Sequence, residues 1–150
     1  VLERCNFRYL ETDKLPVEVP LIVTDVCFIS LRLIVPGVKK FIEPNGDFIA
    51  LIKPQFEAGR ERVGKNGVVK DPAVHIDVIE GLSDFFLEEG FELLALDYSP
   101  ITGASSKNIE YLIHLQYTEQ TAEFERQQWQ QKIKELVAAA HSELGGSKNG

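Results

Sequence analysis

Two charged residues, Asp25 and Lys53, are the strongest candidates for chemistry in this 150-residue chain. Asp25 lies toward the end of an apolar strand expected over residues 21–27, and Lys53 ends a second strand expected over 47–53. Near-continuous apolar runs are typical of strands that are covered on both faces of a parallel sheet. Open α/β sheets bind ligands at the carboxyl ends of their strands. We therefore predict that this acid and this base converge in one crevice.

The elements that must position these residues alternate between strands and helices. Ser30 is a suitable N-cap for a first helix, and Asp71 followed by Pro72 is typical of the start of a second helix, which Gly90 ends. A turn is predicted at 43–46. The apolar face of the first helix is expected at Ile34, Val38, Phe41 and Ile42, and that of the second at Val74, Val78, Leu82 and Phe85. Further strands are expected over 1–4, 91–96 and 110–117, and a last helix over 121–144.

The last two strands follow one another without a helix between them. They are joined by a loop of about a dozen residues and fit a hairpin, which would place one strand antiparallel to an otherwise mostly parallel sheet. This ending differs from a plain dinucleotide-binding domain and suits a methyltransferase sheet. The apolar face of the last helix is expected to pack on the same domain rather than on a partner; it comprises Trp129, Ile133, Leu136, Val137, Ala140 and Leu144.

Composition limits the classes of function. A hydrophobic content of 44% suits one globular domain or part of one. The formal net charge of −7 argues against binding of nucleic acid by phosphate neutralisation through this chain alone. The longest apolar stretch, 21–38, contains two charged residues and a proline, so neither a membrane span nor a membrane partner is expected and the chain is placed in the cytoplasm. Cys5 and Cys27 form no disulfide or metal pattern and are expected to be reduced.

A polar segment over 57–70 carries three glycines and four basic residues. It is long for a connection in a compact domain, which favours a functional loop. His75, His114 and His141 have no second ligand at metal-binding spacing and are expected to be structural. No metal site is predicted.

Four strings carry a resemblance to a known family. They are residues 25–32 (DVCFISLR), 53–60 (KPQFEAGR), 63–72 (VGKNGVVKDP) and 99–103 (SPITG). They closely resemble the hemolysin A (TlyA) family, whose members look like FtsJ-type 2′-O-ribose RNA methyltransferases preceded by an S4 RNA-binding domain. The resemblance covers residues 1–118 and is less distinctive over 119–150, the C-terminal amphipathic helix and tail. It implies the C-terminal part of a Rossmann-like, S-adenosylmethionine-dependent methyltransferase sheet.

The resemblance also implies roles for particular residues. Asp25, Lys53 and Glu110 match three members of the family's Lys-Asp-Lys-Glu catalytic group. Asn6, Phe7 and again Asp25 are expected to contact S-adenosylmethionine. The basic side chains expected to contact phosphates of the substrate RNA are Arg60, Arg62, Lys65 and Lys70. The first catalytic lysine, the glycine-rich cofactor loop and the S4 domain would lie before Val1, so we expect the C-terminal portion of a longer protein, inactive by itself.

The chemistry implied by the resemblance constrains Lys53. A ribose hydroxyl is a poor nucleophile near neutral pH, so a positioned base must help to remove its proton. A lysine can do so only if burial or a neighbouring cation lowers its pKa, whereas Asp25 and Glu110 would raise it. The hypothesis is that Lys53 is the proton acceptor or its close orienter, with the two carboxylates fixing its amine.

Three functions stay open. The leading one is a portion of a ribosomal RNA 2′-O-ribose methyltransferase whose partner is ribosomal RNA or a ribosomal subunit. The alternatives are a membrane-active cytolysin and a non-catalytic RNA-binding module. Because the strand over 21–27 lacks its expected neighbour, it would expose a long apolar edge. A homodimer through that edge, or coverage by the N-terminal residues, is therefore predicted.

Overall fold

A computed structural model describes residues 18–100, 108–118 and 124–145 of the chain. Its strands and helices are β1 (Val19–Thr24), α1 (Leu31–Phe41), β2 (Ile42–Ile52), α2 (Pro72–Glu88), β3 (Phe91–Tyr98), β4 (Tyr111–Tyr117) and α3 (Arg126–Ala140). Short 3₁₀ turns at Pro54–Phe56, Arg60–Arg62 and Lys65–Gly67 lie between β2 and α2, and a π-helical turn, His141–Gly145, continues α3. The predicted strand over 1–4 and the predicted cofactor residues Asn6 and Phe7 lie outside the described residues.

The four strands form one sheet in the order β1-β2-β4-β3. β1 pairs with β2 in parallel, and β4 is antiparallel to both β2 and β3, as the expected final hairpin requires. The first three strands therefore share a direction. The expectation of a mostly parallel sheet is nevertheless not confirmed: because β4 lies between β2 and β3, two of the three neighbouring pairs in the described sheet are antiparallel.

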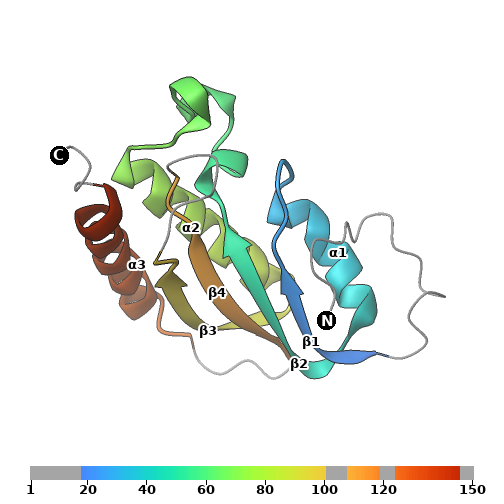
Figure 1. Ribbon diagram of the computed structural model, residues 1–150. Coiled ribbons are helices and arrows are strands. Elements are labelled where there is room, and N and C mark those ends of the chain that lie inside the picture. Colours follow the sequence, from blue (N-terminus) through green and yellow to red (C-terminus); the bar gives the residue numbers. More distant parts are fainter. Residues whose placement is uncertain (1–17, 101–107, 119–123, 146–150) are drawn as a thin grey trace.

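Helices α1 and α2 cover one face of this sheet (Figure 1). Alternate residues of β2 show which face is covered, since Phe48, Ala50 and Ile52 are fully buried whereas Ile49 and Leu51 are half-buried. Both helices connect strands that advance across the sheet in the same direction, and right-handed crossovers place such helices on the same side. β1 lies at one edge of the described sheet, as expected.

Both predicted helix starts are confirmed. The Ser30 side chain accepts a hydrogen bond from the Arg32 N–H at 3.0 Å, and the Asp71 carboxylate accepts one from the Ala73 N–H at 3.0 Å. Each side chain satisfies a backbone donor that has no partner within its helix. Gly90 follows the end of α2 with a φ of 95°, a conformation that favours glycine.

The start of β2 differs from the prediction. The turn expected at 43–46 is an irregularity inside the strand, because Val19 pairs with Ile42 and Leu21 already pairs with Asp47. Ile42 is therefore not part of the α1 face but the first residue of β2, where it is buried. A sequence pattern does not separate these two assignments, because the side chain is buried in both. In α2, Phe86 is fully buried, whereas the sequence pattern had predicted its neighbour Phe85 for the buried face.

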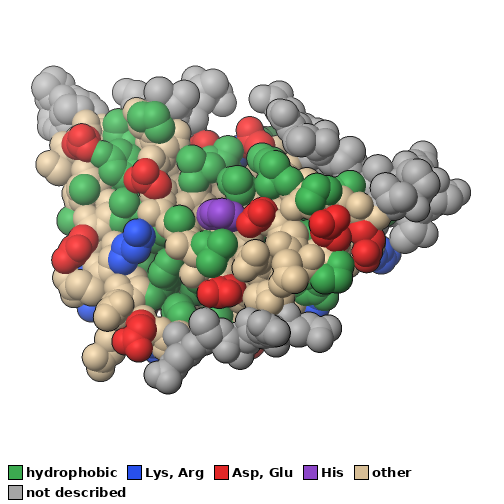
Figure 2. All heavy atoms as spheres, turned by 90° about the horizontal axis from the view of Figure 1, so that it is seen from below, with side chains coloured by type: hydrophobic (Ala, Val, Ile, Leu, Met, Phe, Trp, Pro, Cys, Tyr) green, Lys and Arg blue, Asp and Glu red, His purple; other side chains and the backbone are tan. Residues whose placement is uncertain are grey.

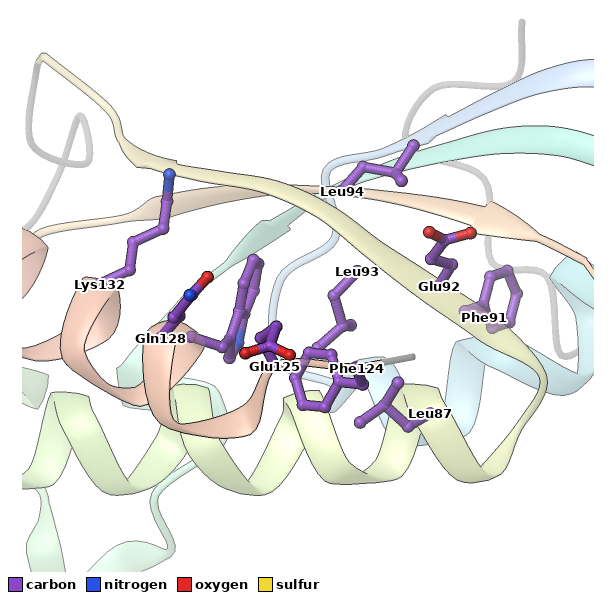
Figure 3. Close-up of a pocket in the computed structure, with 10 residues that line it drawn as sticks. Leu87, Phe91, Glu92, Leu93, Leu94, Phe124, Glu125, Gln128 and Lys132 are labelled. Carbon is purple, nitrogen blue, oxygen red and sulfur yellow. The ribbon is translucent and has the colours of Figure 1, made fainter. Parts of the chain in front are cut away.

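α3 packs against α2 and β3. Ile133, Val137 and Ala140 of α3 are fully buried, which confirms that its apolar face packs on the same domain. A hollow of about 680 Å³ lies between β3 and the start of α3 (Figure 3). There Leu93 points toward the helices and Leu94 points to the opposite side of the strand. None of the residues that line this hollow belongs to the predicted site.

No helix in the described ranges combines the length and the apolar character that a membrane crossing requires.

Candidate functional site

Asp25 and Lys53 each follow directly on the last residue of a strand, β1 and β2 respectively. Because these strands are parallel neighbours, their carboxyl ends lie at the same edge of the sheet. The structure brings the two side chains together: Lys53 Nζ lies 2.6 Å from Asp25 Oδ1. Lys53 also donates a hydrogen bond to Cys27 Sγ at 3.2 Å.

Glu110 reaches the same edge from the other direction. It immediately precedes β4, whose first residue, Tyr111, pairs with Ile52 at the end of β2. An antiparallel strand begins where its parallel neighbours end, so Glu110 stands beside Lys53 although the two lie 57 positions apart in sequence. Burial raises the pKa of Glu110; the positive charge of Lys53 lowers it and the negative charge of Asp25 raises it.

The Lys53 ammonium is buried, with only 8% of the residue exposed. Burial is the largest influence on its pKa and lowers it, but the hydrogen bonds to Asp25 and Cys27 and the charges of Glu110 and Asp25 outweigh burial, so the pKa of Lys53 lies above its ordinary value. Lys53 is therefore an ammonium at neutral pH. With both carboxylates ionised, these three groups carry a formal charge of −1.

Phe28 is a candidate functional residue that the sequence analysis did not identify. Its side chain is 87% exposed, and its φ of 65° lies in the left-handed region. A bulky side chain rarely adopts that conformation, and such strain is concentrated at functional sites. Its ring packs against Phe56, with centroids 5.0 Å apart. The sequence feature that could have identified Phe28 is its position as an aromatic residue three places after Asp25.

Glu57 is a second residue that the sequence analysis missed, and it connects the two segments that carry Asp25 and Lys53. One carboxylate oxygen accepts a hydrogen bond from Ser30 Oγ at 2.7 Å, and the other accepts one from the Leu31 N–H at 2.8 Å. The carboxylate therefore caps the start of α1 from a segment far along the chain, where the helix dipole favours negative charge. Glu57 thus holds the loop after β1 against the loop after β2.

Replacing Glu57 with alanine should lower the free energy of unfolding by about 1–2 kcal/mol, since the start of α1 would lose the backbone cap and the Ser30 contact. Urea denaturation measures this loss. Glu61→Ala is the matched control, because Glu61 is an exposed glutamate of the same segment. Equal stabilities of the two variants would contradict the capping role.

The four predicted RNA-contacting residues are not equivalent. Arg60, Lys65 and Lys70 are exposed, whereas Arg62 pairs with Asp77 at 2.7 Å across an exposed surface. The segment that carries them lies at the same end of the molecule as the carboxyl ends of β1 and β2 (Figure 1).

Asn108 holds the end of this basic segment in place. The buried Asn108 amide accepts a hydrogen bond from the Val69 N–H at 2.9 Å and donates one to the Gly67 carbonyl at 2.9 Å. Because Asn108 lies two residues before Glu110, it fixes the segment beside the charged cluster.

The opposite end of the molecule has a different surface. Figure 2 shows hydrophobic side chains with acidic side chains among them, and few lysines or arginines. The basic segment and this face with few basic side chains therefore lie at opposite ends of the molecule.

His75 has a structural role, as predicted. It is fully buried, with Nε2 lying 2.8 Å from the Val69 carbonyl and Nδ1 lying 2.8 Å from the Tyr111 hydroxyl. A carbonyl only accepts, so Nε2 carries the proton and Nδ1 accepts from Tyr111. His114 lies 2.9 Å from Asp47 on the surface. Within the described ranges, no cluster of three or more His, Cys, Asp or Glu residues could hold a metal ion.

A lysine and two carboxylates lie at the edge of the sheet where the parallel strands β1 and β2 end, which is the edge at which open α/β domains bind ligands. The chain belongs to the FtsJ-like methyltransferase family, which it matches over residues 1–117. The resemblance seen in the four sequence strings is thereby confirmed.

Three similar proteins indicate where in the family the chain lies. It is 44% identical over 149 residues to a Bacillus subtilis protein named as the rRNA methyltransferase YqxC, covering 99% of this chain and 52% of that protein. It is 36% identical over 115 residues to the 16S/23S rRNA (cytidine-2′-O)-methyltransferase TlyA of Mycobacterium tuberculosis, covering 77% and 42%. A solved structure from Streptococcus thermophilus, named as a hemolysin, matches with a TM-score of 0.84 at 40% identity, covering 99% and 52%. The chain spans about half the length of the curated relatives it matches.

Proposed function

We propose that this chain is part of an S-adenosylmethionine-dependent methyltransferase that acts on a ribose 2′-hydroxyl of ribosomal RNA. The observation that carries the proposal is the Lys53 ammonium, buried and 2.6 Å from Asp25, at the edge where Glu110 also arrives. The rRNA methyltransferase names of the relatives support RNA as the substrate. In this proposal the protein works in the cytoplasm, on ribosomal RNA or a ribosomal subunit, and the 150-residue chain alone is inactive.

The contacts of Lys53 favour an orienting role for its amine. An ammonium has three N–H donors, and Asp25 and Cys27 engage two of them among the described residues. The third can donate to the ribose oxygen and hold it in place for attack on the methyl group, while the hydroxyl proton passes to water. The raised pKa of Lys53 opposes its acting as the proton acceptor. A second lysine beside Lys53, as in the Lys-Asp-Lys-Glu group of the proposed family mechanism, would lower that pKa.

The charge of the cluster fits the proposed cofactor. S-adenosylmethionine is cationic at its sulfur, and a cluster with a formal charge of −1 attracts a cation. Asp25, at the end of β1, is the described residue that would lie at the cofactor's methionine end; the proposed contacts of Asn6 and Phe7 lie outside the described residues. When bound, the cofactor supplies the methyl group.

Methyl transfer by the complete natural chain tests this function. Ribosomal subunits and labelled S-adenosylmethionine should give labelled RNA, and a 2′-O-methyl group makes the adjoining phosphodiester resistant to alkali. Labelling of a base instead of a ribose, or no labelling of either subunit, would overturn the proposal.

Phe28 is proposed to stack on a base of the substrate, since exposed aromatic rings are the usual platforms for unpaired RNA bases. Phe28→Ala should weaken RNA binding by about tenfold, the equivalent of one stacked base. Because the ring is 87% exposed, the melting temperature should stay unchanged. Fluorescence anisotropy and thermal melting measure the two effects. Leu94→Ala, which removes an exposed side chain of β3, is the matched control.

Two further proposals each rest on a single observation. The hemolysin name of a similar structure is the ground for a lytic activity, and release of dye from liposomes would reveal one. We also propose a homodimer through the edge of β1, which has no neighbouring strand on that side among the described residues, and sedimentation of the chain would test it.

A further inference from the structure

Strand β3 is the last strand in the sheet order β1-β2-β4-β3, so no described strand pairs with its outer edge. An edge strand presents a row of backbone N–H and C=O groups with which another strand can pair. Residues of β3 also form one wall of the hollow of about 680 Å³, and the start of α3 forms another (Figure 3). Neither the edge nor the hollow has a part in the function proposed above.

One backbone donor of this edge can be placed from its hydrogen bond. The Ser99 N–H donates to the Glu110 carbonyl at 2.8 Å, on the side of β4. Because successive N–H groups of a strand point to opposite sides, the Tyr98 N–H points away from β4, to the outer edge. There it donates to Asp97 Oδ1 at 2.8 Å, in an exposed position. A backbone carbonyl of an added strand can replace this exposed side-chain acceptor.

The two faces of β3 differ in chemistry. Leu93 points toward the helices, whereas Glu92 and Leu94 point to the opposite side of the strand (Figure 3). Asp97 lies on the same face as Glu92, since their partners in β4, Leu112 and Gln116, are four positions apart. The hollow on the helix side has apolar and aromatic lining residues, which include Leu87, Leu93, Phe124 and Trp129. β3 therefore offers an apolar hollow on one face and two carboxylates on the other.

We propose that the outer edge of β3 binds an extended segment of a partner protein in which basic and apolar residues alternate. The segment adds to the sheet through its backbone, places apolar side chains in the hollow and places lysines or arginines beside Glu92 and Asp97. Strand addition of this kind, with affinity from the backbone and specificity from alternate side chains, is a recurring mode of peptide recognition. Opposite charges on neighbouring strands stabilise the pairing.

A second copy of the chain fits this edge less well. If two β3 strands paired antiparallel over their full length, residue 91 would lie opposite residue 98, and Glu92 would lie opposite an Asp97. Like charges directly opposite one another destabilise a strand pair. The register of β3 also shifts between Leu93 and Ala95, and charges and bulges both disfavour the pairing of like edges.

Short synthetic peptides test the chemistry of the partner. The first is a seven-residue peptide in which lysine and leucine alternate, with lysine at both ends, so that its pattern reads the same in both directions. The complete natural chain should bind it about tenfold more tightly than the peptide with glutamate in place of lysine, because two cross-strand charge pairs change from attraction to repulsion. Alanine in place of leucine should weaken binding at least about tenfold. Fluorescence anisotropy of labelled peptides measures the affinities.

Methylation of the peptide backbone tests strand pairing. In an extended peptide the N–H groups of the lysines point to one side and those of the leucines to the other. Only one of these two sets can face β3. N-methylation of that set should abolish binding, and N-methylation of the other set should leave most of it.

Variants of the chain assign the peptide to β3. Glu92→Lys and Asp97→Lys should each weaken the lysine peptide severalfold and strengthen the glutamate peptide, a reversal that misfolding cannot produce. Glu135→Lys makes the same change of charge at an exposed residue of α3 that does not line the hollow, and should produce no reversal.

A second pair of variants tests the hollow. Gln128→Trp adds a large side chain at an exposed residue that lines the hollow, and should weaken the lysine–leucine peptide severalfold. Gln127→Trp makes the same substitution at the next position, which is exposed and does not line the hollow, and should retain the affinity.

Four outcomes would overturn the inference. They are equal affinity for the lysine and glutamate peptides, equal effects of the two N-methylations, a lysine preference that survives both Glu92→Lys and Asp97→Lys, and no binding at millimolar concentration. A dimer of the natural chain that Glu92→Lys strengthens or dissociates would assign the edge to a second copy and would also overturn it. Binding of these peptides does not depend on methyl transfer, so failure of the proposed function would leave this site in place.

Discussion

Lys53→Ala should abolish methyl transfer in the complete natural chain while leaving cofactor binding largely intact. Misplacing a reacting group by about 1 Å can cost about 10²-fold in rate, so losing the amine that orients the ribose oxygen should cost at least about 10²-fold. The reason is structural: Lys53 is the buried cation between Asp25 and Glu110, and alanine leaves those carboxylates facing one another without it. Single-turnover labelling of ribosomal RNA measures the rate, and calorimetric titration with S-adenosylmethionine measures the affinity.

The lysine at position 39 provides a matched control for this substitution. Lys39 also pairs with a carboxylate, that of Glu89 at 3.2 Å, but it lies in the last turn of α1 rather than at the site. Lys39→Ala should retain the full rate. Retained turnover in Lys53→Ala would remove Lys53 from the mechanism. A lost rate that is accompanied by equally lost cofactor affinity would assign Lys53 to cofactor binding instead.

Acidification from pH 7 to pH 4 should lower the free energy of unfolding by about 2–3 kcal/mol through His75 alone. The pKa of His75 is lowered from 6.5 to about 4, and burial is the main cause. The hydrogen bond to the Val69 carbonyl and the charge of Asp71 raise this pKa, whereas the charge of the neighbouring His141 lowers it further. Between these two pH values the unfolded chain binds a proton at this residue and the folded chain does not. Acid therefore favours unfolding, and stability rises with pH through this window.

Urea denaturation at several pH values isolates this contribution. His75→Gln removes the titrating ring but retains a donor for the Val69 carbonyl and an acceptor for the Tyr111 hydroxyl. Its unfolding free energy should depend less on pH than that of the unchanged chain. His114→Gln, a substitution on the surface, should retain the full dependence. Identical pH profiles for all three chains would show that His75 does not couple folding to pH.

The sequence was sufficient to place the two helix starts and the two strand-end charges. Ser30 and Asp71 cap their helices through contacts within two residues of themselves, and such local hydrogen bonds can be read directly from the sequence. Asp25 and Lys53 followed from a general property of parallel strands, whose carboxyl ends share an edge. Their 2.6 Å contact agrees with that expectation.

Contacts between residues far apart in the sequence could not be predicted from the sequence pattern. Glu57 caps α1 from 26 residues away, and a glutamate in a polar segment gives no local sign of such a role. Asn108 likewise holds a backbone segment 39 residues before it. The expectation of a mostly parallel sheet was also not confirmed, because the order of strands in the sheet depends on which faces can be buried together and not on their order in the chain.

Local chemistry therefore determined, from the sequence alone, the element types, the caps and the identity of the charged residues, since each depends on neighbours a few positions away. Tertiary structure alone decided that β4 enters between β2 and β3, which brings Glu110 to the lysine and Asn108 to the basic segment. It also decided the exposure and backbone strain of Phe28. Burial and charge coupling are properties of segments that meet in space, and the spacing of residues along a chain does not specify them.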